Sequence, residues 1–282
     1  MIRMILKGVV IGVANIIPGV SGGTMAVSMG IYDKMIHAAT HLFSEFKESM
    51  KVLIPIVIGA ALGVVALARI IEIMFENIPF QTNLLFIGLI LGGLPAMTKK
   101  VKGKTIRAGH LLACLLFFAM VVGLAVMGER EGAAADLSFN LLNVIKLFGV
   151  GIVASATMVI PGVSGSMMLM LMGYYNPVLS EINRFIDNLL DFNVPGLLEG
   201  CLVLVPFGIG VVIGIFAIAK VIEIIFEKFP EHAYWAIIGL IVASPIAILL
   251  MNEFGAINAV AILTGVFALA AGVVIALKLG EE

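Results

Sequence analysis

Charged residues are scarce in this 282-residue chain, in which Asp, Glu, Lys and Arg together occupy only 12% of positions. Because a soluble domain usually carries about 25% charged residues, the scarcity excludes soluble enzymes, nucleic-acid-binding proteins and disordered chains. The net charge of −1 also provides no basic surface for a polyanion. Apolar residues fill 61% of positions instead, and the mean hydropathy is +1.17. The composition predicts an integral membrane protein with membrane lipids around it and no nucleic-acid partner.

Cysteine is scarcer still, with two residues in the chain. Cys114 and Cys201 stand apart in apolar runs, which excludes a disulfide framework and a cysteine metal centre. His37 and His41 have helical spacing, but without a set of carboxylate partners they are weak evidence for a metal. The sequence therefore predicts no metal site and no cofactor, and it leaves the oligomeric state open.

Apolar stretches are plentiful, and several reach the ~20 residues that cross a bilayer as a helix. The stretch at 83–97 is short and would have to borrow flanking residues. Two others, 4–31 and 141–175, are interrupted by IPGVSGG from Ile17 and by IPGVSGS from Ile160. Proline removes a backbone donor and glycine relaxes the chain. Each interruption therefore predicts two half-helices that meet at a kinked, polar tip.

An internal repeat relates the two interrupted stretches. The motif IPGVSG recurs at an offset of 143 residues, and the helical segment that follows recurs at an offset of 151. Between 54–79 and 205–230, 12 of 26 positions are identical, and prolines, glutamates and a cation stay in register. This predicts two homologous halves, at residues 1–130 and 137–282.

The distribution of Lys and Arg distinguishes parallel from inverted halves. If each broken stretch is a re-entrant hairpin, 12 cationic residues are cytoplasmic and 3 are outside; if it spans, the better split is 9 to 6. The positive-inside rule favours the hairpins. We predict an all-α polytopic protein of the cytoplasmic (inner) membrane with both termini cytoplasmic. Its two inverted-topology repeats would each contain a re-entrant helical hairpin, at 4–31 or 141–175, and three transmembrane helices.

The polar residues of the tips are candidate ligands for an anion such as phosphate. Half-helix N-termini in transporters direct N–H groups at anionic substrates, glycine allows close approach, and hydroxyls add donors. The same small residues also suit simple helix packing. The predicted phosphate-binding residues of the tips are Asn15, Ser21, Gly22, Gly23, Thr24, Ser164, Gly165 and Ser166.

Two cation–acid pairs lie inside the apolar helices, Arg69 with Glu72 and Lys220 with Glu223, each at i,i+3 spacing. Ionisable groups within membrane segments are functional candidates by default. We therefore add Arg69 and Lys220 to the predicted phosphate-binding residues. The alternative is that both pairs snorkel to the interface and neutralise each other.

A basic run at 99–107 contains four lysines and an arginine. We expect it to set the topology and to contact anionic lipid headgroups. A direct role in substrate binding is the less favoured interpretation.

The tip motifs resemble those of a known family. ANIIPGVSGGT at 14–24, together with IPGVSG at 160–165, is similar to the bacterial and archaeal polyprenyl-phosphate transporters, long described as a domain of unknown function. The resemblance extends over the whole chain in length, repeat and motif placement. It implies that a polyprenyl phosphate such as undecaprenyl phosphate moves from the outer to the inner leaflet. This flippase activity would recycle the lipid carrier of peptidoglycan and other envelope glycans.

A flippase with inverted halves suits alternating access, with the phosphate held at the two tips. Moving one negative charge inward against an inside-negative potential costs ~2.3 kcal/mol per 100 mV. Co-transport of H+ or Na+, or consumption of the carrier inside, would offset that cost. Glu72 and Glu223 are the candidate residues for proton or ion coupling.

Two other functions stay open. Membrane polyprenyl-diphosphate phosphatases have a similar Pro-Gly-x-Ser tip, but an Arg follows the Ser there, whereas Gly22 and Gly165 occupy that position here. No paired glutamates and no histidine neighbour either tip, so we predict no catalytic residue and no enzyme activity. A permease for small ions or solutes would need a polar path, and few polar residues lie within the apolar segments.

Overall fold

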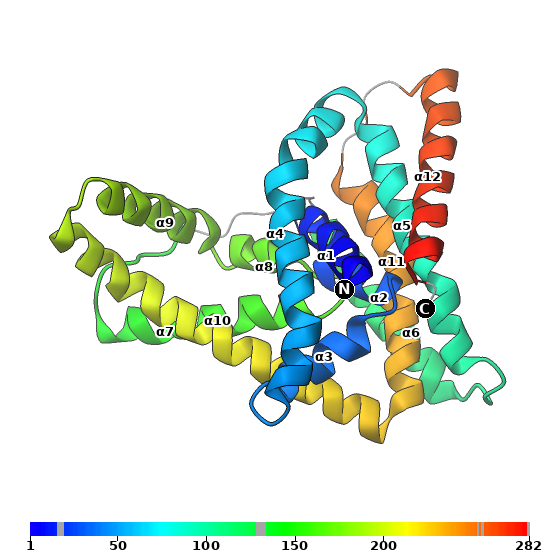
Figure 1. Ribbon diagram of the computed structural model, residues 1–282, viewed down its shortest axis with the longest axis horizontal. Helices are drawn as coiled ribbons and strands as arrows, with labels where there is room; N and C mark the ends of the chain where they lie inside the picture. Colours follow the sequence, from blue (N-terminus) through cyan, green and yellow to red (C-terminus); the bar gives the residue numbers. More distant parts are fainter. Residues whose placement is uncertain (16–19, 128–133, 253, 255–256, 281–282) are drawn as a thin grey trace. The chain divides into compact units, whose positions relative to one another are not determined.

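A computed structural model describes residues 1–15, 20–127, 134–252, 254 and 257–280, and the regular elements in this part of the chain are all α-helices (Figure 1). This confirms the predicted all-α class. The helices are α1 (Ile2–Ala14), α2 (Gly22–Ser28), α3 (Tyr32–Thr40), α4 (Phe46–Asn77), α5 (Pro79–Val101), α6 (Ala108–Met127), α7 (Leu141–Val159), α8 (Gly165–Leu171), α9 (Tyr175–Leu190), α10 (Val194–Lys228), α11 (Pro230–Met251) and α12 (Ala259–Gly280).

Seven of these helices are long and apolar enough to cross a membrane, namely α4, α5, α6, α7, α10, α11 and α12. The short apolar stretch at 83–97 does borrow flanking residues, because α5 runs from Pro79 to Val101. Helix α7 lies inside 141–175, the stretch predicted to form the second re-entrant hairpin. The chain is therefore a multi-pass membrane protein.

The chain divides into two compact units. The first contains Met1–Gly128, Ile160–Val163 and Ala219–Glu282, and the second contains Glu129–Val159 and Ser164–Ile218. These compact units do not coincide with the two homologous halves that the sequence repeat predicts. The boundaries of the halves, 1–130 and 137–282, stay a prediction.

Helix α2 lies in the core of the first unit. Its residues Met25, Ala26 and Val27 are completely buried, and α2 contacts α1, α5 and α11. Around it, α12 lies beside α5 and α6 lies beside α11 (Figure 1). By contrast, α4 exposes large apolar side chains such as Val57 and Val65. An apolar face of this kind is expected where a helix meets lipid rather than water.

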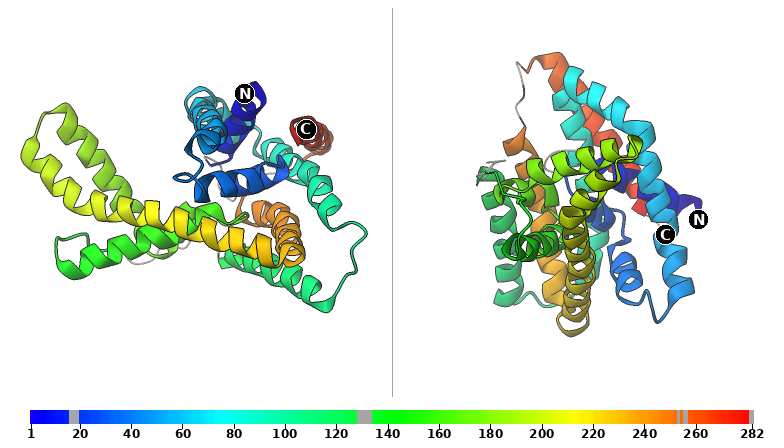
Figure 2. Two further views of the ribbon diagram at one scale, coloured as in Figure 1. Left: turned by 60° about the horizontal axis from the view of Figure 1, so that its bottom comes forward. Right: turned by 90° about the vertical axis from the view of Figure 1, so that its left-hand side faces the viewer.

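Close helix contacts recur at equivalent places in the two sequence halves. Gly59 and Gly63 of α4 face the backbone of α1, and these two helices lie side by side (Figure 2). Their counterparts Gly210 and Gly214 of α10 face the backbone of α7 within the second unit. A side chain at Gly59 or Gly210 would collide with a backbone carbonyl of the partner helix. Small residues therefore permit the same close packing in both halves.

Backbone conformations also recur between equivalent residues. Gly30 after α2 and Gly173 after α8 have φ values of 66° and 75°. Ile78 (φ −138°, ψ 55°) and Phe229 (φ −135°, ψ 52°) each precede a proline that opens the next helix. Proline suits the first helical position because its fixed φ is preorganised there and no N–H is needed.

Candidate functional site

The first tip begins after residues 16–19, which include Ile17, Pro18 and Gly19 of the motif and lie outside the described residues. Ser21 is extended (φ −107°, ψ 135°), and α2 starts at Gly22. The Gly22 N–H donates a 3.1 Å hydrogen bond to Asn15 Oδ1. The first N–H groups of a helix have no intrahelical partner. The Asn15 side chain therefore satisfies one of these donors and lies against the tip, close to where it was predicted.

Thr24 connects the two motifs. Its side chain is buried, and its Oγ1 accepts a 2.7 Å hydrogen bond from the N–H of Gly162 in the second motif. Gly162 lies in the turn after α7 with φ 79°, a conformation that glycine adopts readily. The two motifs, far apart in the sequence, therefore meet inside the first unit. Ser21, three residues before Thr24 in the sequence, is also buried, and Gly23 is partly buried.

The remaining predicted tip residues belong to the second unit. Ser164 is extended (φ −97°, ψ 128°), much like Ser21, and α8 starts at Gly165. The hydroxyls of Ser164 and Ser166 lie 2.7 Å apart, and Ser166 is exposed. This hydroxyl pair can donate to an anion.

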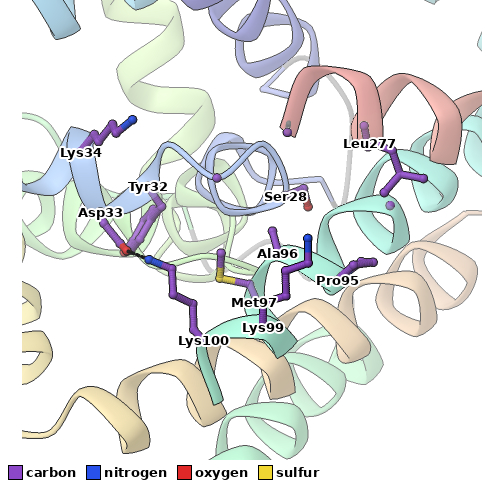
Figure 3. A pocket seen from close by; sticks show the side chains of 14 residues that line it. Ser28, Tyr32, Asp33, Lys34, Pro95, Ala96, Met97, Lys99, Lys100 and Leu277 are labelled. Atoms are coloured by element: carbon purple, nitrogen blue, oxygen red, sulfur yellow. Dashed lines mark ion pairs between the residues drawn. The ribbon is translucent and has the colours of Figure 1, made fainter. Parts of the chain in front are cut away.

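A cavity of about 590 Å³ lies at the other end of α2 (Figure 3). We call it the basic cavity because three lysines line it: Lys34 from α3, and Lys99 and Lys100 from the last turn of α5. Ser28, the last residue of α2, lines it too, and the Ser28 hydroxyl donates a 3.2 Å hydrogen bond to the Ile90 carbonyl. The cavity is thus built where α2, α3, α5 and the end of α12 come together.

Asp33 is the carboxylate of the basic cavity. Its Oδ2 lies 3.8 Å from Lys100 Nζ and accepts a 3.1 Å hydrogen bond from the Tyr234 hydroxyl. The Lys100 ammonium also lies 5.7 Å from the centre of the Tyr234 ring. Burial, reinforced by the nearby charge of Asp33, raises the pKa of Tyr32, so its phenol stays protonated. Among the described residues that line the cavity, three ammonium groups accompany one carboxylate, and this excess of positive charge suits a phosphate.

Lys7 fixes the end of α2. This lysine is 5% exposed, and its Nζ donates a 2.9 Å hydrogen bond to the carbonyl of Met29, directly after the helix. Carbonyls at a helix C-terminus lack intrahelical donors, and a nearby cation stabilises them. Lys7 therefore holds the end of α2 that carries Ser28.

Both predicted ion pairs form. On α4, Arg69 Nη1 lies 2.8 Å from Glu72 Oε2, and both side chains are largely exposed. On α10, Lys220 Nζ lies 2.5 Å from Glu223 Oε2, and the Glu223 side chain is only 8% exposed. Thr40 Oγ1 donates a 2.8 Å hydrogen bond to the other oxygen of Glu223. Neither pair lines the basic cavity.

The model of a family described as undecaprenyl phosphate translocase-like matches residues 11–261. The chain belongs to this family. Two similar proteins are each named polyprenyl-phosphate transporter. The one from Staphylococcus aureus is 30% identical over 247 residues, which cover 86% of this chain and 84% of that protein. The one from Vibrio cholerae is 27% identical over 254 residues, which cover 85% and 74%. No solved structure matches the chain significantly.

Membership of the translocase-like family confirms the resemblance inferred from the tip motifs. The similar proteins carry the name of a transporter rather than of an enzyme. The described residues of the tips and the basic cavity supply N–H, hydroxyl and ammonium donors. Such groups can form hydrogen bonds with an anion.

The basic cavity was not predictable from the sequence. Lys99 and Lys100 belong to the basic run at 99–107, for which the sequence favours a role in topology, and no motif marks Lys34. The run itself was the available signal. Nothing in the sequence indicated that the end of α2 would lie beside it.

Proposed function

We propose that this chain transports a polyprenyl phosphate across the cytoplasmic membrane, as the names of its relatives suggest. One observation carries the proposal: α2 joins the two kinds of phosphate-binding groups. Thr24 in its first turn contacts the second motif, and Ser28 at its end lines the basic cavity. At 1.5 Å per residue, the four-residue step from Thr24 to Ser28 separates them by about 6 Å along the helix axis.

In the proposed path, the phosphate is first attracted into the basic cavity by Lys34, Lys99 and Lys100. It then passes along α2 to the tips, where it competes with Asn15 Oδ1 for the Gly22 N–H and with Thr24 Oγ1 for the Gly162 N–H. The polyprenyl tail stays in the hydrocarbon beside the exposed apolar helix faces. Only the head then needs polar partners.

Two inverted repeats with opposed re-entrant hairpins would give such a site access to each side in turn. The recurrent glycine contacts and the matching backbone conformations support the repeat. In this arrangement α7 is the first arm of the second hairpin, both termini are cytoplasmic, and the halves are residues 1–130 and 137–282. The carrier would move to the inner leaflet by alternating access and be reused for envelope glycans, including peptidoglycan.

Inward movement of the anionic head needs compensation, since each negative charge costs ~2.3 kcal/mol per 100 mV. We propose that H+ or Na+ accompanies the lipid and that Glu72 and Glu223 take part in the coupling. Arg69 and Lys220 are the ion-pair partners of these glutamates. In the proposed path, one of them would receive the phosphate at each end of the transport pathway.

The test uses purified full-length protein in liposomes that contain a labelled polyprenyl phosphate, with leaflet accessibility as the readout. We expect Lys99→Gln to slow transport about tenfold, the effect of losing one charge-assisted contact worth about 1.4 kcal/mol. Lys102→Gln, from the same basic run but outside the cavity lining, should change the rate less than about twofold. Equal rates for the two variants would contradict the role of the cavity.

The tips are tested in the same liposomes. Thr24→Val keeps the shape of the side chain and removes the hydroxyl that meets Gly162, whereas Thr98→Val removes an exposed hydroxyl on α5. We expect only the first variant to slow transport. Release of inorganic phosphate would identify a phosphatase instead, and ion flux without lipid movement would identify a permease.

A further inference from the structure

Three side chains that can ligate a metal ion meet within the first unit. His41 Nδ1 lies 3.1 Å from Glu223 Oε1, and His37 Nδ1 lies 3.6 Å from the same oxygen. We propose that His37, His41 and Glu223 form a binding site for a divalent transition-metal ion of the Zn²⁺ type. This site goes beyond the proposed transport function, which requires no metal.

The distances from Glu223 Oε1 to the two imidazoles are close to those of tetrahedral coordination. Zinc lies about 2.0–2.2 Å from nitrogen and carboxylate ligands, so two ligand atoms of a tetrahedral site are separated by about 3.3–3.5 Å. The separations of 3.1 and 3.6 Å in the structure lie on either side of this range. The ligand atoms of the three residues all fall within 4.8 Å of one another. Small side-chain rotations would therefore seat the ion.

The local structure presents both histidines to the same oxygen. His37 lies in the last turn of α3, and His41 caps the end of that helix. Residues four apart on a helix share a face, and the two rings stack with their centres 4.2 Å apart. Glu223 comes from α10 and completes the set, so the carboxylate that the sequence lacked beside the histidines is supplied by tertiary packing.

The groups around the three ligands hold them in place. Glu45 Oε2 lies 3.4 Å from His37 Nε2, and a histidine that ligates a metal commonly donates its other ring N–H to a carboxylate in this way. Thr40 donates to Glu223 Oε1, and Lys220 occupies Glu223 Oε2. Because Lys220 takes one carboxylate oxygen, Glu223 would ligate the ion through the other one.

The donor set selects the class of ion. Imidazole nitrogen suits Zn²⁺ and neighbouring transition metals, whereas Mg²⁺ and Ca²⁺ prefer oxygen ligands throughout. A hollow of about 270 Å³ is lined by His37 and Glu223, which leaves room for water as a fourth ligand. Three protein ligands and one open position are compatible with a zinc-type ion.

A bound ion would connect two parts of the first unit that lie far apart in the sequence. Helix α3, which also carries the cavity residues Asp33 and Lys34, would be fastened to the end of α10. Metal occupancy would thus restrain the element beside the basic cavity.

The test measures Zn²⁺ binding to purified full-length protein in detergent, after a chelator has removed bound metal, by competition with a chromophoric chelator. We expect one ion per chain. His41→Ala and His37→Asn should weaken binding at least 100-fold, and Glu45→Gln should weaken it roughly tenfold. Replacement of Zn²⁺ by Co²⁺ should give the strong visible absorption of a tetrahedral site, which His41→Ala should abolish.

His232→Ala is the matched control, because His232 pairs with His110 in a second histidine contact, with ring centres 4.6 Å apart. It should bind Zn²⁺ like the unmodified protein. His37 is 56% exposed, so its replacement by Asn tests the site without disturbing the core, and gel filtration and helical circular dichroism check the fold. No stoichiometric Zn²⁺, or equal affinity in His37→Asn, His41→Ala and the unmodified protein, would overturn the proposal. Since the assay contains no lipid, its result is independent of the transport proposal.

Discussion

The pair Arg69–Glu72 on α4 and the pair Lys220–Glu223 on α10 occupy equivalent positions of the repeat, yet their surroundings differ. In the first pair, the side chains are 78% and 55% exposed. In the second pair, Glu223 is almost completely buried and also receives the hydroxyl of Thr40. Equal spacing along a helix therefore produced two ion pairs, and among the described residues a wider polar network surrounds Glu223.

The polar network of the second pair comes from α3, the helix that follows the first tip. Helix α3 places Thr40, His37 and His41 against Glu223. At the repeat offset of 143, the two histidines are replaced by Ser180 and Arg184. The symmetry of the pairs is thus broken by residues outside them. We expect Glu72 and Glu223 to contribute differently to stability. We also expect only Glu223, on α10, to take part in a metal site.

The largest difference should appear when each acid is neutralised. Glu223→Gln removes the charge from a buried carboxylate that is bound by Thr40 and Lys220. It should lower the midpoint of thermal unfolding by roughly 5 °C. Glu72→Gln breaks an exposed pair and should lower it by less than about 2 °C. Thermal scans of both variants in the same detergent make the measurement, and similar shifts would show that burial does not distinguish the pairs.

The two cations provide the next comparison, with transport as the readout. Lys220→Gln leaves the buried Glu223 without its charged partner and should slow lipid movement about tenfold. Arg69→Gln should slow it less than about threefold, because its partner is solvated. Both are measured in liposomes with the labelled lipid. A larger effect of Arg69→Gln would contradict this prediction and would show that the cation on α4 contributes more to transport than the cation on α10.

A smaller effect on stability is expected from loss of the Thr40 hydroxyl, which contacts Glu223. Thr40→Val removes the donor to Glu223 Oε1 and nearly preserves the volume of the side chain. One hydrogen bond to a charged group should reduce the unfolding midpoint by about 3 °C. In the Glu223→Gln background, the same change should have less effect, since the charged acceptor is gone. Additive shifts in the double variant would contradict a direct interaction.

The smallest effect should come from an exposed acid of the second unit, Asp136, between the spans. Hydrogen bonds from the Ser138 N–H (2.8 Å) and from its hydroxyl (2.7 Å) lower the pKa of Asp136. A lowered pKa means that the contribution to stability is present above the unfolded-state value of about 3.9 and is lost as the pH falls. Asp136→Asn should therefore unfold slightly earlier than the unmodified protein at pH 7, and the difference should shrink as the pH falls below about 3.9. A difference that grows on acidification would contradict this assignment.

Much of the fold followed from the sequence. Long apolar runs predicted the membrane helices, and proline and glycine predicted that no helix runs through the second motif, where α7 ends at Val159 and α8 begins at Gly165. The repeat predicted that equivalent residues behave alike, as Ser21 and Ser164 do. The spacing of Arg69 and Glu72 predicted an ion pair that forms. Each of these features depends on a few residues close together in the chain.

The site was less predictable. The tip residues were named from their chemistry, but the hydrogen bond from Gly162 to Thr24 joins positions in different halves. Lys99 and Lys100 looked like topology signals because their distance from Ser28 is invisible in the sequence. His37 and His41 have no carboxylate near them in the sequence that would complete a metal site. The carboxylate is Glu223, 183 positions beyond Thr40, and Thr40 lies between the two histidines and donates a hydrogen bond to it.

The sequence by itself determined that this chain is helical, lies in the membrane, breaks its helices at two related motifs and belongs to a translocase-like family. These properties depend on local composition, backbone geometry and short-range spacing. Tertiary structure alone decided which polar groups share a site. That choice depends on which helix faces meet, and here the meeting of α2 with α5, and of α3 with α10, brought together a basic cavity and a buried carboxylate. In an apolar environment such polar groups must find partners, so the packing of the helices assigned those partners.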